Sequence, residues 1–137
     1  MNIFEKHFFT PKSETHYLTE DTTIRQALEK FDYHKFSVVP LIGKDGAYLT
    51  TVSEGDILRY IKNQAGFDIR QAENIPILAI EKYRPYTACG HTVSEDEIFR
   101  LALNQNFVPI VDDRGLFIGI IKRRSILDLL YADRPKQ

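Results

Sequence analysis

Two side chains that could bind a ligand stand three residues apart in "TTVSEGDIL" (50–58), where a β-like run gives way to a helix-like one. Ser53 and Asp56 form an S-x-x-D pattern, which caps helices because each side chain accepts a hydrogen bond from the other residue's backbone N–H. The same junction offers backbone N–H groups and the positive end of a helix to an anion, and a carboxylate beside them can accept hydrogen bonds from a cis-diol. Gly55 removes a side chain where a ligand would approach. The pattern therefore predicts a helix cap, a ligand site, or both.

A second group of reactive residue types, "CGH" (89–91), lacks the partners that chemistry would need. One Cys and one His do not make a zinc site without further ligands at suitable spacing, and His7, His16 and His34 form no recognisable set. The sequence also has no P-loop, dinucleotide fingerprint or nucleophile elbow. We therefore expect no metal and no catalytic cofactor, and we expect that the protein is not an enzyme.

The overall composition is that of an ordinary globular domain of 137 residues, 43% of them apolar. Its 18 basic and 19 acidic residues give a formal charge of −1, which provides no general attraction to nucleic acid or to an anionic membrane. The single Cys89 excludes an intramolecular disulfide, and no apolar run approaches the roughly 20 residues needed to cross a bilayer. Charges near the start argue against a signal peptide. We expect a cytoplasmic protein that binds neither nucleic acid nor membranes.

The candidate cap lies inside an internal repeat. At an offset of 69 residues, "VVPLIGKDGAYLTTVSEGDILRYI" (38–61) aligns without a gap with "FVPIVDDRGLFIGIIKRRSILDLL" (107–130). Upstream, Thr23-Ile24 falls on Thr92-Val93 at the same offset. Chance gives a poor account of so long a match, so the sequence indicates a true duplication.

Each copy contains the same succession of predicted elements. Apolar residues at helical spacing come first, two short apolar runs separated by a Gly turn follow as strands, and a second helix closes the copy. Gly46 and Gly115 in these turns suit a positive φ, and Ser94 with Glu97 predicts a capping box. The predicted ranges are a leading strand at 16–18, a helix at 23–34, strands at 37–42 and 47–52 and a helix at 54–63, then a leading strand near 84–88, a helix at 94–105, strands at 107–111 and 116–121 and a helix at 123–132.

Such a strand–helix–strand–strand–helix unit has an apolar face that it cannot bury alone. Two copies packed as a pseudo-twofold pair bury more, so we predict an α+β fold with small sheets packed against helices. The predicted organisation is a first repeat with an N-terminal leader at 1–66, a connector at 67–82 and a second repeat at 83–137. The apolar "IPILAI" (75–80) indicates that the connector is a docked segment rather than a free linker.

These residues resemble a tandem pair of cystathionine-β-synthase (CBS) domains, also called a Bateman module. The resemblance rests on "VVPLIGKDGAYLTTVSEGDIL" and "FVPIVDDRGLFIGIIKRRSIL", in which a strand ends near a Pro, turns at a Gly and leads through a second strand into a helix. It covers about residues 10–132 and is closest to the stand-alone pairs common in bacteria. The resemblance implies a non-catalytic regulatory module that binds an adenine nucleotide, AMP, ADP or ATP, in the cleft between the repeats and dimerises through its helices.

The resemblance also implies which residues bind the nucleotide. In the family pattern the Ser or Thr of [ST]-x-x-D contacts phosphate and the Asp holds the ribose hydroxyls, while the strand before the Pro and the leading segment enclose the base. The leader offers two candidates near the phosphates or the base, although it could equally be an ordinary surface tether. The candidates in the first repeat are Ser53, Asp56, Val39, Pro40, Lys12 and Ser13.

The second repeat departs from the family pattern. Lys122 stands where Ser or Thr is expected and Ser125 stands where Asp is expected, so the carboxylate that would hold ribose is missing. The basic "KRR" (122–124) is either a solvated turn or a source of phosphate contacts, because Arg123 or Arg124 could make bidentate contact with phosphates of a ligand held by the first repeat. We therefore predict one asymmetric site, in the first repeat.

Two alternatives to a mononucleotide sensor remain open. The resemblance implies a cyclic di-AMP receptor as the first alternative, because some similar stand-alone pairs bind that ligand, and the two arginines would suit its second phosphate. The second is a ligand-free protein-interaction module with a degraded site, which Ser125 favours and the intact Ser53 and Asp56 disfavour.

Overall fold

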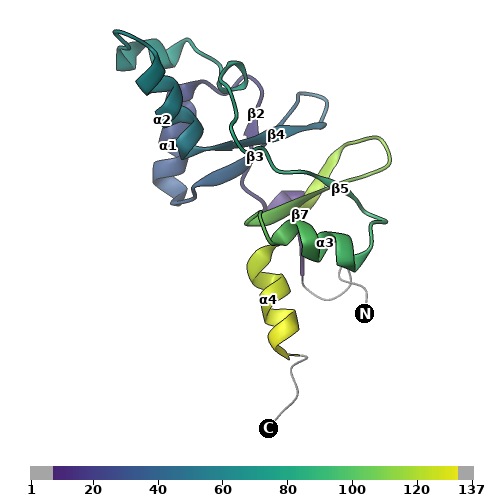
Figure 1. Cartoon of the computed structure of the whole chain (residues 1–137). Coiled ribbons are helices and arrows are strands. Elements are labelled where there is room, and N and C mark those ends of the chain that lie inside the picture. Colours follow the sequence, from purple (N-terminus) through teal and green to yellow (C-terminus); the bar gives the residue numbers. More distant parts are fainter. Residues whose placement is uncertain (1–7, 133–137) are drawn as a thin grey trace. The chain divides into compact units, whose positions relative to one another are not determined.

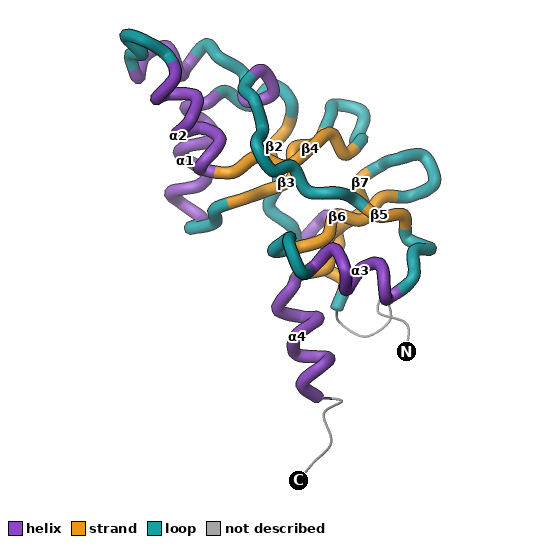
Figure 2. Tube along the Cα trace, viewed as in Figure 1, coloured by secondary structure: helices purple, strands orange, loops and turns teal. Residues whose placement is uncertain are grey.

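The computed structural model describes residues 8–132, which form two compact units (Figures 1 and 2). One unit is the continuous stretch 16–85. The other combines residues 8–15 with residues 86–132. Each unit carries one of the two predicted repeats of helix, strand, strand and helix.

The unit of residues 16–85 contains a three-stranded sheet with two helices that lie side by side next to it (Figure 1). Strand β2 runs parallel to β3, and β3 runs antiparallel to β4. Val38 of β3 lies opposite Ser53 of β4, so Ser53 ends the strand pair where the second helix begins. The elements are β2 (Leu18–Thr19), α1 (Ile24–His34), β3 (Val38–Ile42), β4 (Tyr48–Ser53), α2 (Glu54–Asn63) and the 3-10 helices η2 (Ile69–Glu73) and η3 (Ile77–Ala79).

The connector is packed into the core of this unit, as its apolar run predicted. Ala72 and Ile77 are fully buried in the same cluster as Ile24, Ala27 and Phe31, which form the buried face of α1. Two backbone hydrogen bonds, of 2.9 and 2.7 Å, join the connector to the segment that starts α1. The connector therefore has a fixed position on this unit.

The unit of residues 8–15 and 86–132 contains a four-stranded sheet in the order β1-β7-β6-β5. The leader supplies β1, which pairs antiparallel with β7 with Phe9 opposite Ile121, a pairing that the sequence did not predict. A Cβ at Gly119 would lie 2.3 Å from the Thr10 carbonyl oxygen, so only Gly lets β1 approach this closely. The elements are β1 (Phe9–Pro11), the 3-10 helix η1 (Lys12–Glu14), β5 (Cys89–Gly90), α3 (Glu95–Ala102), β6 (Phe107–Val111), β7 (Phe117–Lys122) and α4 (Arg123–Ala132).

The turns between the paired strands confirm the predicted role of their glycines. Gly46 and Gly115 have φ values of 92° and 80°. The backbone bond from Gly43 N to Ala47 O measures 2.8 Å, and its counterpart from Asp112 N to Leu116 O measures 2.9 Å. The 69-residue offset thus relates hydrogen bonds as well as residue types.

Upstream of these turns, four details of the prediction are wrong. The leading strands fall at Leu18–Thr19 and Cys89–Gly90, each later than predicted, because only those residues pair with the central strands. The helix predicted to reach residue 105 ends at Ala102. The helix caps Thr23 and Ser94 are two residues further apart than the 69-residue offset allows, so the match of Thr23-Ile24 with Thr92-Val93 is not a structural equivalence.

The predicted capping box of Ser94 and Glu97 forms in part. Glu97 N donates to Ser94 Oγ at 3.2 Å, but the Glu97 carboxylate accepts from Arg100 Nε at 3.0 Å instead of from the cap. This side-chain hydrogen bond from Arg100 lowers the pKa of Glu97. Arg100 therefore competes with the cap residue for the same carboxylate.

Candidate functional site

The Ser53–Asp56 pair forms a complete capping box at the start of α2, as predicted. Asp56 N donates to Ser53 Oγ at 3.1 Å, and Ser53 N donates to Asp56 Oδ2 at 2.9 Å. A backbone bond from Glu54 N to Ser37 O, 3.0 Å long, also ties the junction to the loop before β3. The two side chains thus satisfy N–H groups that a helix start leaves unpaired.

The Asp56 carboxylate has a further partner that the sequence did not indicate. Its Oδ1 atom accepts a hydrogen bond from Tyr83 N at 3.0 Å, although the two residues lie 27 positions apart. Asp56 is only 3% exposed. A buried carboxylate is costly unless its oxygens are hydrogen-bonded, and here each oxygen accepts a backbone N–H. Asp56 therefore joins the start of α2 to the segment that follows the connector.

Arg59 adds a cation to the same junction. It lies one turn after Asp56 on α2, and its guanidinium carbon is 4.7 Å from the centre of the Tyr83 ring, a cation–π contact. A Cβ at Gly55 would lie 3.4 Å from Arg59 Nη1 and 3.6 Å from Ser53 Oγ, so Gly55 lies between these two polar groups. Sequence reasoning missed Arg59, whose only signal is its helical spacing from Asp56.

Lys82 fixes the segment before Tyr83. Its ammonium donates to the carbonyl oxygens of Ile77, Leu78 and Ile80 at 2.8, 2.8 and 2.6 Å. Burial lowers the pKa of Lys82, and the charge of Asp56 opposes that shift. The connector thus ends in a lysine that binds three of its own carbonyl groups.

The two candidate base-contacting residues belong to the same unit as the capping box. Val39 and Pro40 lie on β3, opposite Val52 and Thr51 of β4, one and two residues along from the Val38–Ser53 pair. Both are buried, and Val39 is 1% exposed. The structure therefore brings Ser53, Asp56, Val39 and Pro40 to one part of the first repeat's unit.

The other four predicted site residues belong to the other unit. Lys12 and Ser13 form part of η1, beyond the strand that pairs with β7. Arg123 Nε donates to Ala102 O at 2.7 Å, so its guanidinium contacts the C-terminal end of α3, where a cation is favoured. Arg124, the next residue on α4, is exposed.

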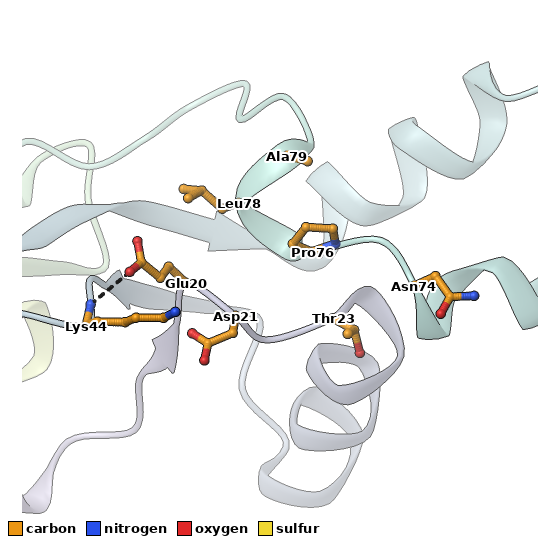
Figure 3. A pocket seen from close by; sticks show the side chains of 8 residues that line it. All are labelled: Glu20, Asp21, Thr23, Lys44, Asn74, Pro76, Leu78 and Ala79. Carbon is orange, nitrogen blue, oxygen red and sulfur yellow. Dashed lines mark hydrogen bonds between the residues drawn. The ribbon is translucent and has the colours of Figure 1, made fainter.

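The unit of residues 16–85 also has a pocket that sequence reasoning did not find (Figure 3). Its volume is about 560 Å³, and it opens between the β2–α1 loop, the β3–β4 turn and the connector. Lys44 N donates to Glu20 Oε1 at 3.2 Å at its edge. Because Lys44 follows β3, the pocket lies at the opposite end of the β3–β4 pair from Ser53. It is lined by Glu20, Asp21, Thr23, Lys44, Asn74, Pro76, Leu78 and Ala79.

Other candidate chemistry receives little support in the part of the chain that the structure describes. Cys89 is buried, and burial raises the pKa of its thiol, which disfavours the reactive thiolate. Between residues 8 and 132, no three His, Cys, Asp or Glu side chains come together in a way that could hold a metal ion. None of the helices in that range has the length and apolar character to cross a membrane.

Comparison with known proteins finds a family model that matches part of the chain, and solved structures with a similar fold. Residues 8–63 match the model of the CBS domain. No curated protein sequence matches the chain.

Three solved structures illustrate the similarity of fold. CbpB of Listeria monocytogenes in complex with c-di-AMP is 17% identical, with 90% of this chain and 92% of that one covered and a TM-score of 0.80. A hypothetical conserved protein from Geobacillus kaustophilus is 19% identical, with 98% of each chain covered and a TM-score of 0.84. CBSX2 in complex with AMP is 22% identical, with 93% and 96% covered and a TM-score of 0.70. These similarities confirm the predicted α+β fold.

Proposed function

Because residues 8–63 belong to the CBS-domain family and the chain has the fold of tandem CBS-domain proteins, we propose that this protein is a non-catalytic regulatory module that binds an adenine nucleotide. The ligand is AMP, ADP or ATP. The observation that carries the proposal is the buried Asp56, whose oxygens each accept one backbone N–H, beside Ser53 and Arg59 at the start of α2.

Each group at this junction suits one part of a nucleotide. The Asp56 carboxylate can accept hydrogen bonds from the ribose hydroxyls. The Ser53 hydroxyl, the Arg59 guanidinium and the positive end of α2 together suit phosphate. The remaining predicted contacts stay part of the proposal. Val39 and Pro40 lie near the base, Lys12 and Ser13 near the phosphates or the base, and Arg123 or Arg124 contacts phosphate.

A cyclic di-AMP receptor is the second candidate. CbpB was solved with c-di-AMP and CBSX2 with AMP, so the same fold accommodates both ligands. The observation in favour of the dinucleotide is a pair of adjacent arginines, Arg123 and Arg124, at the start of α4, which suits a second phosphate. Binding of neither ligand would favour the interaction module without a ligand.

We also propose that the module is a cytoplasmic homodimer in which the two copies contact each other through their helices. Leu58 on α2 is 59% exposed, and Leu127, its counterpart at the same offset on α4, is 57% exposed. Leu130 and Tyr131 add further exposed apolar surface on α4. Exposed apolar residues that recur at equivalent helix positions favour association. Sedimentation of wild type and of Leu58→Ser/Leu127→Ser would test this, with a monomeric wild type contradicting it.

Thermal unfolding with added ligand tests the nucleotide proposal. A ligand that binds only the native state raises its stability, by about 2.7 kcal/mol when present at 100 times its Kd. We expect AMP, ADP, ATP or cyclic di-AMP to raise the Tm. S-adenosylmethionine, a related adenosine compound, is titrated in the same way. Asp56→Asn should reduce the rise, whereas Asp128→Asn, on an exposed position of α4, should not. No rise with any compound at millimolar concentration would contradict the proposal.

A further inference from the structure

The Asp56 carboxylate, which the nucleotide would use, is covered and already hydrogen-bonded in this structure. Asp56 is 3% exposed, its Oδ2 accepts from Ser53 N and its Oδ1 accepts from Tyr83 N. The Ser53 bond belongs to the helix cap and is local. The Tyr83 bond comes from a distant segment, so it is the one that can open without unfolding α2.

Tyr83 is held against α2 by two contacts that come from a single face of that helix. Asp56 binds its backbone N–H, and Arg59, three residues later, contacts its ring at 4.7 Å. On its N-terminal side, the Lys82 ammonium is fixed by three connector carbonyls. On its C-terminal side, the chain reaches the other unit at residue 86.

We propose that Tyr83 is a gate over the Asp56 carboxylate, and that nucleotide binding opens it. The inference rests on the proposed function, because the incoming ribose hydroxyls are what displace Tyr83 N from Asp56 Oδ1. A side chain as covered as Asp56 cannot receive a ribose while the Tyr83 segment stays in place.

Opening the gate gives the module an output. Tyr83 lies three residues before the other unit begins, so its release from α2 frees the last residues of the unit that contains Asp56. The closed gate also lowers the apparent affinity, since a ligand binds only the fraction of molecules in the competent state.

Hydrogen exchange of the Tyr83 amide, followed by NMR, tests the gate directly. In the free protein this amide should be protected, and saturating AMP or cyclic di-AMP should make it exchange faster. The Thr87 amide is a matched control, because it donates to a side-chain oxygen, Gln105 Oε1, at 2.8 Å in the other unit. If a nucleotide binds while Tyr83 protection stays the same or rises, the gate is wrong and the proposed function stands.

Calorimetry of two tyrosine variants tests the predicted effect on affinity. Tyr83→Ala removes the ring contact with Arg59 but keeps the backbone N–H, so we expect about two- to fivefold tighter binding of AMP or cyclic di-AMP. Tyr33→Ala, at an 81% exposed position of α1, is the control and should bind like wild type. Binding by Tyr83→Ala alone would support the gate, and equal or weaker binding than wild type would overturn it. If neither wild type nor Tyr83→Ala binds either nucleotide, the proposed function fails and the gate with it.

Discussion

The two strand-to-helix junctions of this molecule share a backbone design and differ in their side chains. In the first repeat Glu54 N donates to Ser37 O at 3.0 Å, and in the second Arg123 N donates to Asn106 O at 2.9 Å, at the same 69-residue offset. The first junction adds a capping box. The second has Lys122 and Ser125 at the equivalent positions, and Arg123 reaches back to the end of α3.

The difference shows that this junction does not need S-x-x-D to form. The second repeat makes the same strand, backbone bond and helix without it. The buried carboxylate of the first repeat therefore serves more than the local fold. In the structure it holds Tyr83, and in our proposal it exchanges Tyr83 for a nucleotide.

The largest effect on stability is expected at Gly119 of the second repeat. The equivalent position of the first repeat, 69 residues earlier, is Thr50. A Cβ at Gly119 would lie 2.3 Å from Thr10 O and 2.6 Å from the Phe9 ring, so Gly119→Val should separate β1 from β7 or lower the free energy of unfolding by about 3 kcal/mol. Gly90→Ala, where a Cβ meets nothing within 4 Å, should change it by less than about 0.5 kcal/mol. Urea unfolding measures both, and a fully stable Gly119→Val would show that β1 is dispensable.

The next effect separates the two junctions directly. Asp56→Ala leaves two part-buried N–H groups, of Ser53 and Tyr83, without their acceptor and should lower the free energy of unfolding by about 2 kcal/mol. Its counterpart Ser125→Ala should cost less than about 0.5 kcal/mol. Equal losses in chemical denaturation would mean that the junctions are energetically alike after all.

A smaller effect should follow from giving the second junction the first one's cap. Because the backbone bond is already present, Lys122→Ser combined with Ser125→Asp should raise the free energy of unfolding by about 1 kcal/mol. The Lys122→Ser single variant, which lacks the reciprocal carboxylate, is the control. A double variant no more stable than this control would contradict the equivalence of the two junctions.

The smallest effect on stability concerns the two Gly turns. The turn of the second repeat has the Asp112 side chain, where the first repeat has a glycine. Asp112 Oδ1 accepts from Leu116 N and Arg114 N, each at 2.9 Å, and its counterpart is Gly43. The hydrogen bond from Leu116 lowers the pKa of Asp112 below its ordinary value of 3.8. The resulting stabilisation is present above that value and is lost as the pH falls through the lowered pKa.

An NMR titration of the Asp112 carboxyl carbon would measure this effect. We expect a midpoint below 3.8, with faster exchange of the Leu116 amide in the same pH range. Asp112→Asn should remove the change in Leu116 protection that follows this titration, leaving only the intrinsic pH dependence of amide exchange. A midpoint at or above 3.8 would show that the turn does not depend on the ionised side chain.

The parts that could be predicted from the sequence are those with local causes. Helix faces, Gly turns and the Ser53–Asp56 cap all join residues within a few positions of each other, so spacing reveals them. The contacts that were missed join segments distant in sequence. Examples are the pairing of β1 with β7 and the hydrogen bond between Tyr83 and Asp56. Local competition explains why the Ser94–Glu97 capping box forms only in part, because Arg100 binds the Glu97 carboxylate that would complete it.

The pairing of β1 with β7 has a consequence for the order in which the chain folds during synthesis. Residues 16–85 form one uninterrupted unit, so its strands and helices all emerge from the ribosome in succession. Among the described elements strand β1 is made before the others, yet its partner at Phe117–Lys122 is made more than a hundred residues later. Contacts so distant in sequence form slowly because a long loop must close first. Strand β1 is therefore expected to be among the last of the described elements to reach its native position.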